Sequence, residues 1–101
     1  MTQPALILLV RFRSRLPFEE MRAIMDERAP EFRRLEGLQQ KYYMRDAATG
    51  ECAGLYLWQS KQAFDEYRDS ELRKSIAAAY QAEGEPRIEV FDVMMTLSED
   101  G

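Results

Sequence analysis

The stretch that most constrains the fold is residues 53–58 (AGLYLW), an unbroken run of apolar and aromatic residues without a charge. A strand with one face in water alternates apolar and polar residues, and this run does not, so we expect both of its faces to be covered. After Ser60 the period changes, because Ala63, Phe64 and Tyr67 recur at helical spacing. The sequence therefore predicts a central strand that leads directly into a helix covering one of its faces.

The remaining elements are marked by apolar patterns and by turn residues. A helix is expected from Pro17 to Gly37, with a kink or restart near Ala29 because Pro30 interrupts the pattern. The helix after Ser60 is expected to break near residues 69–70. Further expected elements are strands at residues 5–13, 38–45 and 87–95, a helical segment at residues 71–80, and a loose tail at residues 97–101.

The order β-α-β-β-α-β predicts an α+β fold, namely the ferredoxin-like arrangement with a four-stranded antiparallel sheet and both helices on one face. We interpret residues 1–101 as a single domain. Three of the four strands are apolar on both faces, and an uncovered apolar face of this size is rare in monomers. The sequence therefore predicts a homodimer in which a second copy covers the other face.

Composition narrows the classes of function. The net charge of −4 disfavours nucleic acid as a partner, although Arg11, Arg13 and Arg15 form a local basic patch. Cys52 is the single cysteine, so no intrachain disulfide is expected, and we predict a cytoplasmic protein. No signal peptide and no apolar run of membrane-spanning length is visible, so no membrane partner is expected.

The chain contains no histidine. Histidine is the commonest general base and metal ligand near neutral pH, so its absence limits the chemistry available. We predict no metal site, no haem and no other cofactor. Cys52 is interpreted as a small buried side chain and not as a nucleophile, because no histidine is present to activate it.

Three blocks resemble one known family. They are GLYLWQSKQAFDEY at residues 54–67, RIEVFDVMMTLS at residues 87–98 and FRRLEGLQQKYYMRD at residues 32–46. Together they resemble the YdhR-type monooxygenases of the dimeric α+β barrel superfamily, over nearly the whole chain. The resemblance implies two ferredoxin-like subunits that pair sheet to sheet. It also implies a monooxygenase, although the superfamily includes isomerases, haem enzymes and proteins without a known role.

The hairpin at residues 46–51 sets which residues lie opposite each other. If Asp46 opposes Glu51, then Tyr43 opposes Gly54, Lys41 opposes Tyr56, and Gln39 opposes Trp58. Tyr56 and Trp58 would then share a face with Lys41 and Tyr43, and the opposite face of these two strands would pack on the helices. We interpret the Tyr56 face first as a dimer interface and second as a ligand-binding wall.

Several single residues are candidates for a site. Tyr42, Tyr67 and Tyr80 are candidates to line a cavity between helices and sheet, or else to be core aromatics with satisfied hydroxyls. Asp92 lies among apolar neighbours in the last expected strand, so it is either a base in a cavity or the buried partner of Arg11, Arg13 or a backbone group. Arg11 is the first charged residue after the apolar run of its strand. It is a candidate either to bind an anionic oxygen of a ligand or to form an ion pair with an acid.

Three functions remain open at this point. The first is a cofactor-independent monooxygenase acting on a small aromatic or polyketide-like molecule, with Asp92, a tyrosine or Lys41 as base. The second is a non-catalytic small-molecule-binding or stress-associated dimer. The third is a proton-transfer isomerase. A base in a closed cavity favours the first or third, and an apolar cavity with paired charges favours the second.

Overall fold

Four strands and two helical stretches follow one another in the predicted order. The computed structural model describes residues 3–98. Its elements are β1 (Leu6–Phe12), α1 (Phe18–Arg33), β2 (Leu38–Arg45), β3 (Cys52–Trp58), α2 (Lys61–Arg68), α3 (Glu71–Lys74), α4 (Ile76–Ala79) and β4 (Arg87–Asp92). The boundaries of β2 agree with the prediction, whereas β1 and β4 are shorter than expected. The last three residues of the predicted tail lie outside the described residues.

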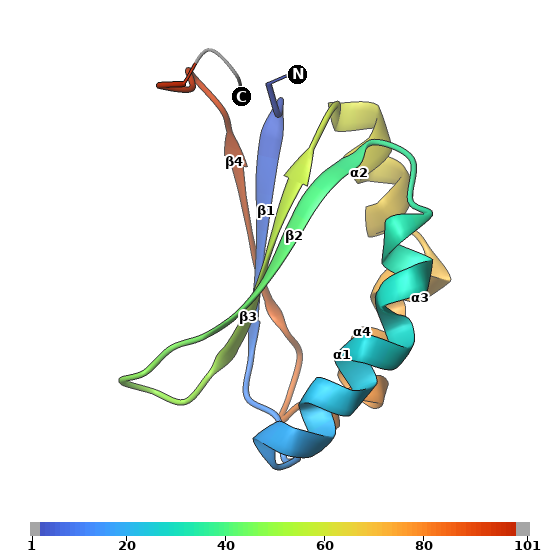
Figure 1. Cartoon of the computed structure of the whole chain (residues 1–101), viewed down its shortest axis with the longest axis vertical. Helices are drawn as coiled ribbons and strands as arrows, with labels where there is room; N and C mark the ends of the chain where they lie inside the picture. The colour runs from blue at the N-terminus through green and yellow to red at the C-terminus, as the bar shows by residue number, and fades with distance from the viewer. Residues whose placement is uncertain (1–2, 99–101) are drawn as a thin grey trace.

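The strands form one antiparallel sheet in the order β2-β3-β1-β4. All the helices lie on one side of this sheet, and the other side carries no helix (Figure 1). The ferredoxin-like prediction is thus confirmed, and the apolar run on β3 is a central strand. No helix among residues 3–98 combines the length and apolar character that crossing a membrane requires.

Serine side chains set the starts of the helices after β3. The Ser60 hydroxyl accepts a hydrogen bond from the backbone N–H of Ala63 at 3.1 Å and so begins α2. The Ser70 hydroxyl accepts one from the N–H of Arg73 at 3.2 Å and begins α3. The predicted break near residues 69–70 is therefore confirmed, and it divides the helical layer into short segments.

Two details of the first helix differ from the prediction. Pro30 lies inside α1, which continues to Arg33, so the expected restart is wrong and the alternative of a kink stays a prediction. Gly37 lies beyond the end of α1 and has a φ of +85°, and a Cβ there would overlap the Cβ of Ala63. Gly37 thus allows the chain to approach α2 closely, which is a different role from the helix-terminating one we expected.

The hairpin register was predicted correctly except at its far end. Tyr43 pairs with Gly54 and Lys41 pairs with Tyr56, as expected. Trp58, however, pairs with Leu38, because a β-bulge between Leu38 and Gln40 shifts the register.

The predicted assignment of faces is wrong. Tyr56 and Trp58 face the helices, and only 1% and 0% of their surfaces are exposed. They lie opposite Leu8 and Leu6 of β1, which are also buried under the helices. Both faces of β3 are apolar, so the sequence pattern alone could not say which face packs against the helices.

The outer face of the sheet is aliphatic and carries exposed aromatic groups at its edges. Ile7, Leu9, Leu55 and Leu57 are partly buried at its centre. Tyr42 on β2 is half exposed here, facing away from the helices, so the predicted place of Tyr42 in a helix–sheet cavity is wrong. Further exposed groups of this face are Met44 and Phe91.

Candidate functional site

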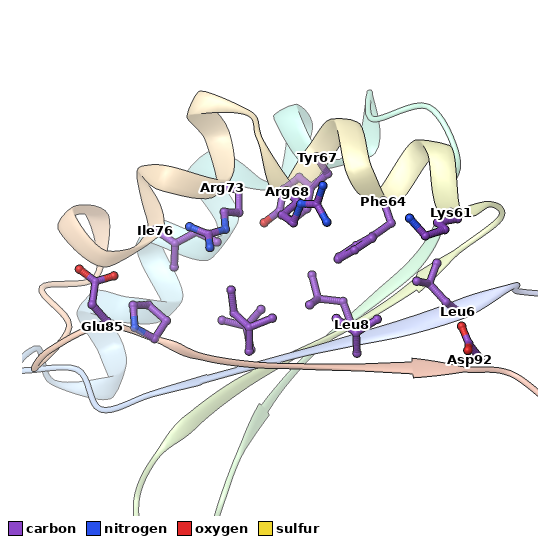
Figure 2. A pocket seen from close by; sticks show the side chains of 14 residues that line it. Leu6, Leu8, Lys61, Phe64, Tyr67, Arg68, Arg73, Ile76, Glu85 and Asp92 are labelled. Carbon is purple, nitrogen blue, oxygen red and sulfur yellow. The ribbon is translucent and has the colours of Figure 1, made fainter.

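A cleft of about 370 Å³ lies between α2–α4 and the β1–β4 half of the sheet (Figure 2). Its floor is aliphatic, and Phe64 and Tyr67 on α2 form part of its roof. The helices do not fully cover β4, and 39% of Ile88 and 46% of Val90 remain exposed. The floor residues are Leu6, Leu8, Val10, Ile88 and Val90. This cleft suits a flat, apolar ligand.

Two arginines reach from the helices into the cleft. Figure 2 shows Arg68 and Arg73 extending from the helices toward the sheet. Arg68 forms ion pairs with Asp65 at 3.3 Å and with Asp69 at 3.5 Å. Arg73 forms no ion pair within residues 3–98, so its guanidinium is available to an anionic oxygen. The sequence pattern did not predict a role for Arg73, because the cleft is formed with β4, which is distant from Arg73 in the chain.

Asp92 lies at one end of the cleft and Glu85 at the other (Figure 2). Asp92 shares the helix-facing parity of β4 and pairs with Leu6 of β1. Its predicted burial is wrong, because the side chain is exposed, and it forms no ion pair with Arg11 or Arg13. Since β4 is an edge strand under incomplete helical cover, solvent reaches this carboxylate, and no cation forms an ion pair with it within residues 3–98.

Arg11 lies on the opposite face of the sheet from Asp92. Successive residues of a strand alternate between faces, and Arg11 has the parity of Ile7 and Leu9. Its guanidinium contacts Asp46 at 3.7 Å. The predicted pairing of Arg11 with Asp92 is therefore wrong, and the ion-pair alternative for Arg11 is met by Asp46 instead.

An aromatic cluster fills the space between β3 and α2, beside the cleft. Tyr56 stacks on Trp58 with ring centroids 6.3 Å apart, and Tyr67 contacts both rings. The Tyr67 hydroxyl donates a hydrogen bond to the Tyr56 hydroxyl at 3.2 Å. Burial raises the pKa of Tyr56 well above its usual value and that of Tyr67 to about 12. These phenols are thus neutral near pH 7 and serve as hydrogen-bonding groups, not as bases.

Lys41 enters this cluster from β2. Its Nζ lies 3.5 Å from the ring centroid of Phe32, 4.4 Å from that of Tyr43 and 4.6 Å from that of Tyr56. Burial, with a smaller contribution from the nearby Arg28 guanidinium, lowers the pKa of Lys41 to about 7. Lys41 was one of the candidate bases predicted from the sequence. Its surroundings bring its pKa close to neutral pH, where an amine can accept a proton.

The remaining predicted site residues lie around Lys41 or in the core. Tyr43 lines a groove between α1 and β2 together with Lys41. Tyr80 is buried, its hydroxyl has no hydrogen-bond partner among residues 3–98, and burial raises its pKa to about 12. Cys52 is buried with its Sγ 3.4 Å from the Sδ of Met21, and burial raises the pKa of its thiol.

Metal-ligating side chains are scattered through the described part of the chain. No group of three or more His, Cys, Asp or Glu residues within residues 3–98 is placed to hold a metal ion.

Sequence and structural comparisons agree with the architecture. The family model described as "Putative mono-oxygenase ydhR" matches residues 7–100. None of the curated proteins is significantly similar in sequence to this chain.

Several solved structures share the fold. SnoaB, a cofactor-independent oxygenase from Streptomyces nogalater, superposes with a TM-score of 0.73 at 17% identity, over 95% of this chain and 99% of that chain. Rv0793 from Mycobacterium tuberculosis gives 0.71 at 22% identity, over 92% and 98%. The ActVA-Orf6 monooxygenase of Streptomyces coelicolor, in complex with the ligand nanaomycin D, gives 0.68 at 16% identity, over 94% and 92%.

Proposed function

Because this chain belongs to the family described as "Putative mono-oxygenase ydhR", we propose that it is a cofactor-independent monooxygenase of electron-rich aromatic, polyketide-like molecules. The observation that carries the proposal is the cleft between α2–α4 and the sheet. Its aliphatic floor and aromatic roof favour a planar ring system, and its volume of about 370 Å³ accommodates a small polycyclic compound. Two structural neighbours, the cofactor-independent oxygenase SnoaB and the ActVA-Orf6 monooxygenase in complex with nanaomycin D, support the same class of ligand.

The proposed chemistry needs a proton acceptor and a group that stabilises negative charge. A phenol or anthrone that loses a proton is electron-rich enough to transfer an electron to O2, and a site of low polarity protects the intermediates from water. We assign the proton acceptor to Asp92 at the end of the cleft and the oxyanion contact to Arg73, which has no competing carboxylate within the described residues.

The test uses 1,8-dihydroxyanthrone as a probe. The anthrone CH2 becomes a carbonyl, one O2 is consumed, and the second oxygen atom leaves as water. We expect the protein to accelerate O2 uptake above the spontaneous rate, with the quinone formed in equal amount. Uptake no faster than that of the free probe, despite tight binding, would favour the non-catalytic binding protein instead.

Arg73→Gln separates catalysis from binding. Removing one charged donor to a developing oxyanion is expected to lower kcat by about 10²-fold. Lys74→Gln is the matched control, because Lys74 is adjacent, exposed and outside the cleft. Equal rates for the two variants would rule out the proposed role of Arg73.

Asp92→Asn tests the proposed proton acceptor. It is expected to slow proton removal from the probe while probe binding persists.

The proposal includes a second copy of the chain on the outer face of the sheet. That face presents partly buried aliphatic residues at its centre and exposed aromatic groups toward its edges, and no helix covers it (Figure 1). Pairing two such faces would bury the whole patch, as homodimer interfaces do. Sedimentation at micromolar concentration is expected to give twice the chain mass of 11.8 kDa. Leu57→Asp, on the outer face, is expected to weaken the dimer, and a folded wild-type monomer would disprove the pairing.

A further inference from the structure

Lys41 belongs to a second concavity, separate from the cleft over β4. A groove of about 500 Å³ runs between α1 and β2 and is lined by Lys41. The two concavities share none of their lining residues. The groove also has apolar walls, which include Phe18, Met25 and Ala29 of α1.

The Lys41 amine has no carboxylate partner within residues 3–98. The rings of Phe32, Tyr43 and Tyr56 surround its Nζ in place of an acid. Asp26 lines the same groove but forms an ion pair with Arg22, with 3.6 Å between Oδ2 and Nε. A lysine that is desolvated and also close to another cation is held partly unprotonated, which makes its amine nucleophilic. Both conditions apply here, since burial and then Arg28 lower the pKa of Lys41 to about 7.

A small cavity adjoins the groove at Lys41. It has a volume of about 20 Å³ and is lined by Lys41, Tyr56 and Tyr80. The Tyr80 hydroxyl, on a residue that is 5% exposed, has no hydrogen-bond partner among the described residues. A cavity of this size holds about one water molecule. The site therefore offers room and a polar partner for the water that an amine releases on condensing with a carbonyl.

Three arginines line the groove, and one of them, Arg22, is paired with Asp26. Arg33 on α1 and Arg45 on β2 both line it, and neither forms an ion pair with a carboxylate in the described part of the chain. The Arg45 guanidinium lies over the Phe18 ring at 5.0 Å. A ligand with an aromatic body and a carboxylate would match these apolar walls and these unpaired cations.

We propose that this groove is a second small-molecule site, in which the Lys41 amine forms an imine with the aldehyde or ketone of an anionic aromatic ligand. The amine nitrogen attacks the carbonyl carbon, the carbonyl oxygen leaves as water with two protons from nitrogen and solvent, and a C=N bond remains. The reaction is reversible and consumes no oxidant. The groove and the cleft over β4 share no lining residue, so labelling in the groove is measured separately from O2 uptake in the cleft. The small cavity at Lys41 does share Val10 and Ile76 with the cleft.

The experiment is reductive trapping of the wild-type protein at pH 7 with 4-carboxybenzaldehyde and sodium cyanoborohydride. Hydride adds to the imine carbon and leaves a stable secondary amine, whose position is read by peptide mass mapping. Lys61 and Lys74 are the other lysines of the chain and serve as internal controls. We expect Lys41 to be modified at least about tenfold faster than either, because its amine is desolvated.

Benzaldehyde is the matched probe without a carboxylate. We expect it to modify Lys41 more slowly than 4-carboxybenzaldehyde, and Arg45→Gln is expected to reduce that difference. Equal modification of all the lysines would contradict the proposal that the Lys41 amine is unusually reactive. Equal rates with the two aldehydes would contradict the proposal that the ligand is anionic. Lys41→Arg is expected to abolish the fast adduct, while Lys61→Arg leaves it unchanged. The labelling pattern of the wild-type protein decides the question even if a variant fails to fold.

Discussion

The two halves of the layer between helices and sheet are built differently. Between β3 and α2 the space is filled by packed aromatic rings, and Trp58 is completely buried. Over β4 the floor is aliphatic, and nearly half of Val90 remains exposed. The difference follows from the chain order, since α2 begins directly after β3 and places Phe64 and Tyr67 on the rings of that strand. The segments α3 and α4 are short, and β4 is left partly open.

The contrast indicates where stability and function lie. A closely packed aromatic cluster contributes strongly to the free energy of folding, because each ring buries a large area. An open cleft contributes little to folding, but it leaves apolar area for a ligand to cover. Lys41, on β2 beside this cluster, is an exception. Its burial with no acid partner among the described residues costs stability, which indicates a functional reason for its position.

The largest expected effect separates the two halves directly. Trp58→Ala is expected to lower the free energy of unfolding by about 3–5 kcal/mol, because it leaves a large cavity among packed rings. Val90→Ala is expected to cost less than about 1 kcal/mol, because the side chain is half exposed. Urea unfolding at a fixed chain concentration measures both. Similar losses would show that the cleft floor is as important for folding as the cluster.

The next effect concerns the pH dependence of stability that arises from Lys41. Its pKa of about 7 in the folded protein lies below the ordinary 10.5, so between these values the unfolded chain binds more protons. Stability is therefore expected to rise with pH in this window, by about 2–3 kcal/mol from pH 6 to pH 9. Lys41→Met is expected to remove this rise and to stabilise the protein at pH 6. If the free energy of unfolding of Lys41→Met depends on pH as that of the wild type does, the lowered pKa of Lys41 is contradicted.

The smallest effect compares two buried phenols. Tyr67→Phe removes the donor to the Tyr56 hydroxyl and leaves that oxygen buried without its partner, at a cost of about 1–2 kcal/mol. Tyr80→Phe removes a hydroxyl that has no partner among the described residues, so it is expected to be within about 0.5 kcal/mol of neutral or to be stabilising. Thermal unfolding of both variants tests the pair. A clear loss in Tyr80→Phe would indicate that a water molecule satisfies this hydroxyl.

Local chemistry accounted for most of the fold. Helices begin after Ser60 and after the predicted break near residues 69–70, and the Asp46–Glu51 turn places Tyr43 opposite Gly54. The order of elements was sufficient for the ferredoxin-like topology. The bulge at Leu38 and the unbroken passage of α1 through Pro30 depend on packing between elements, which short-range patterns do not record.

The candidate site was predicted less well, because it depends on which face each strand presents. Tyr67 and Tyr80 were expected at the helix–sheet interface and lie there, whereas Asp92 was expected to be buried and is exposed. Arg73 had no sequence signal, since its importance arises from a cleft formed with β4. Lys41 was one of several candidate bases until its aromatic surroundings distinguished it.

The sequence by itself determined that β3 is a central strand, that a helix follows it, and that one sheet face lacks a helical cover. Those conclusions depend on residue type and spacing, which are local. Only the tertiary structure decided that Tyr56 and Trp58, and not Leu55 and Leu57, pack under the helices. The physical reason is that both parities of this strand are apolar, so burial of either satisfies the hydrophobic effect. The choice is made by the shape of the helical layer, where Phe32, Phe64 and Tyr67 accept large rings.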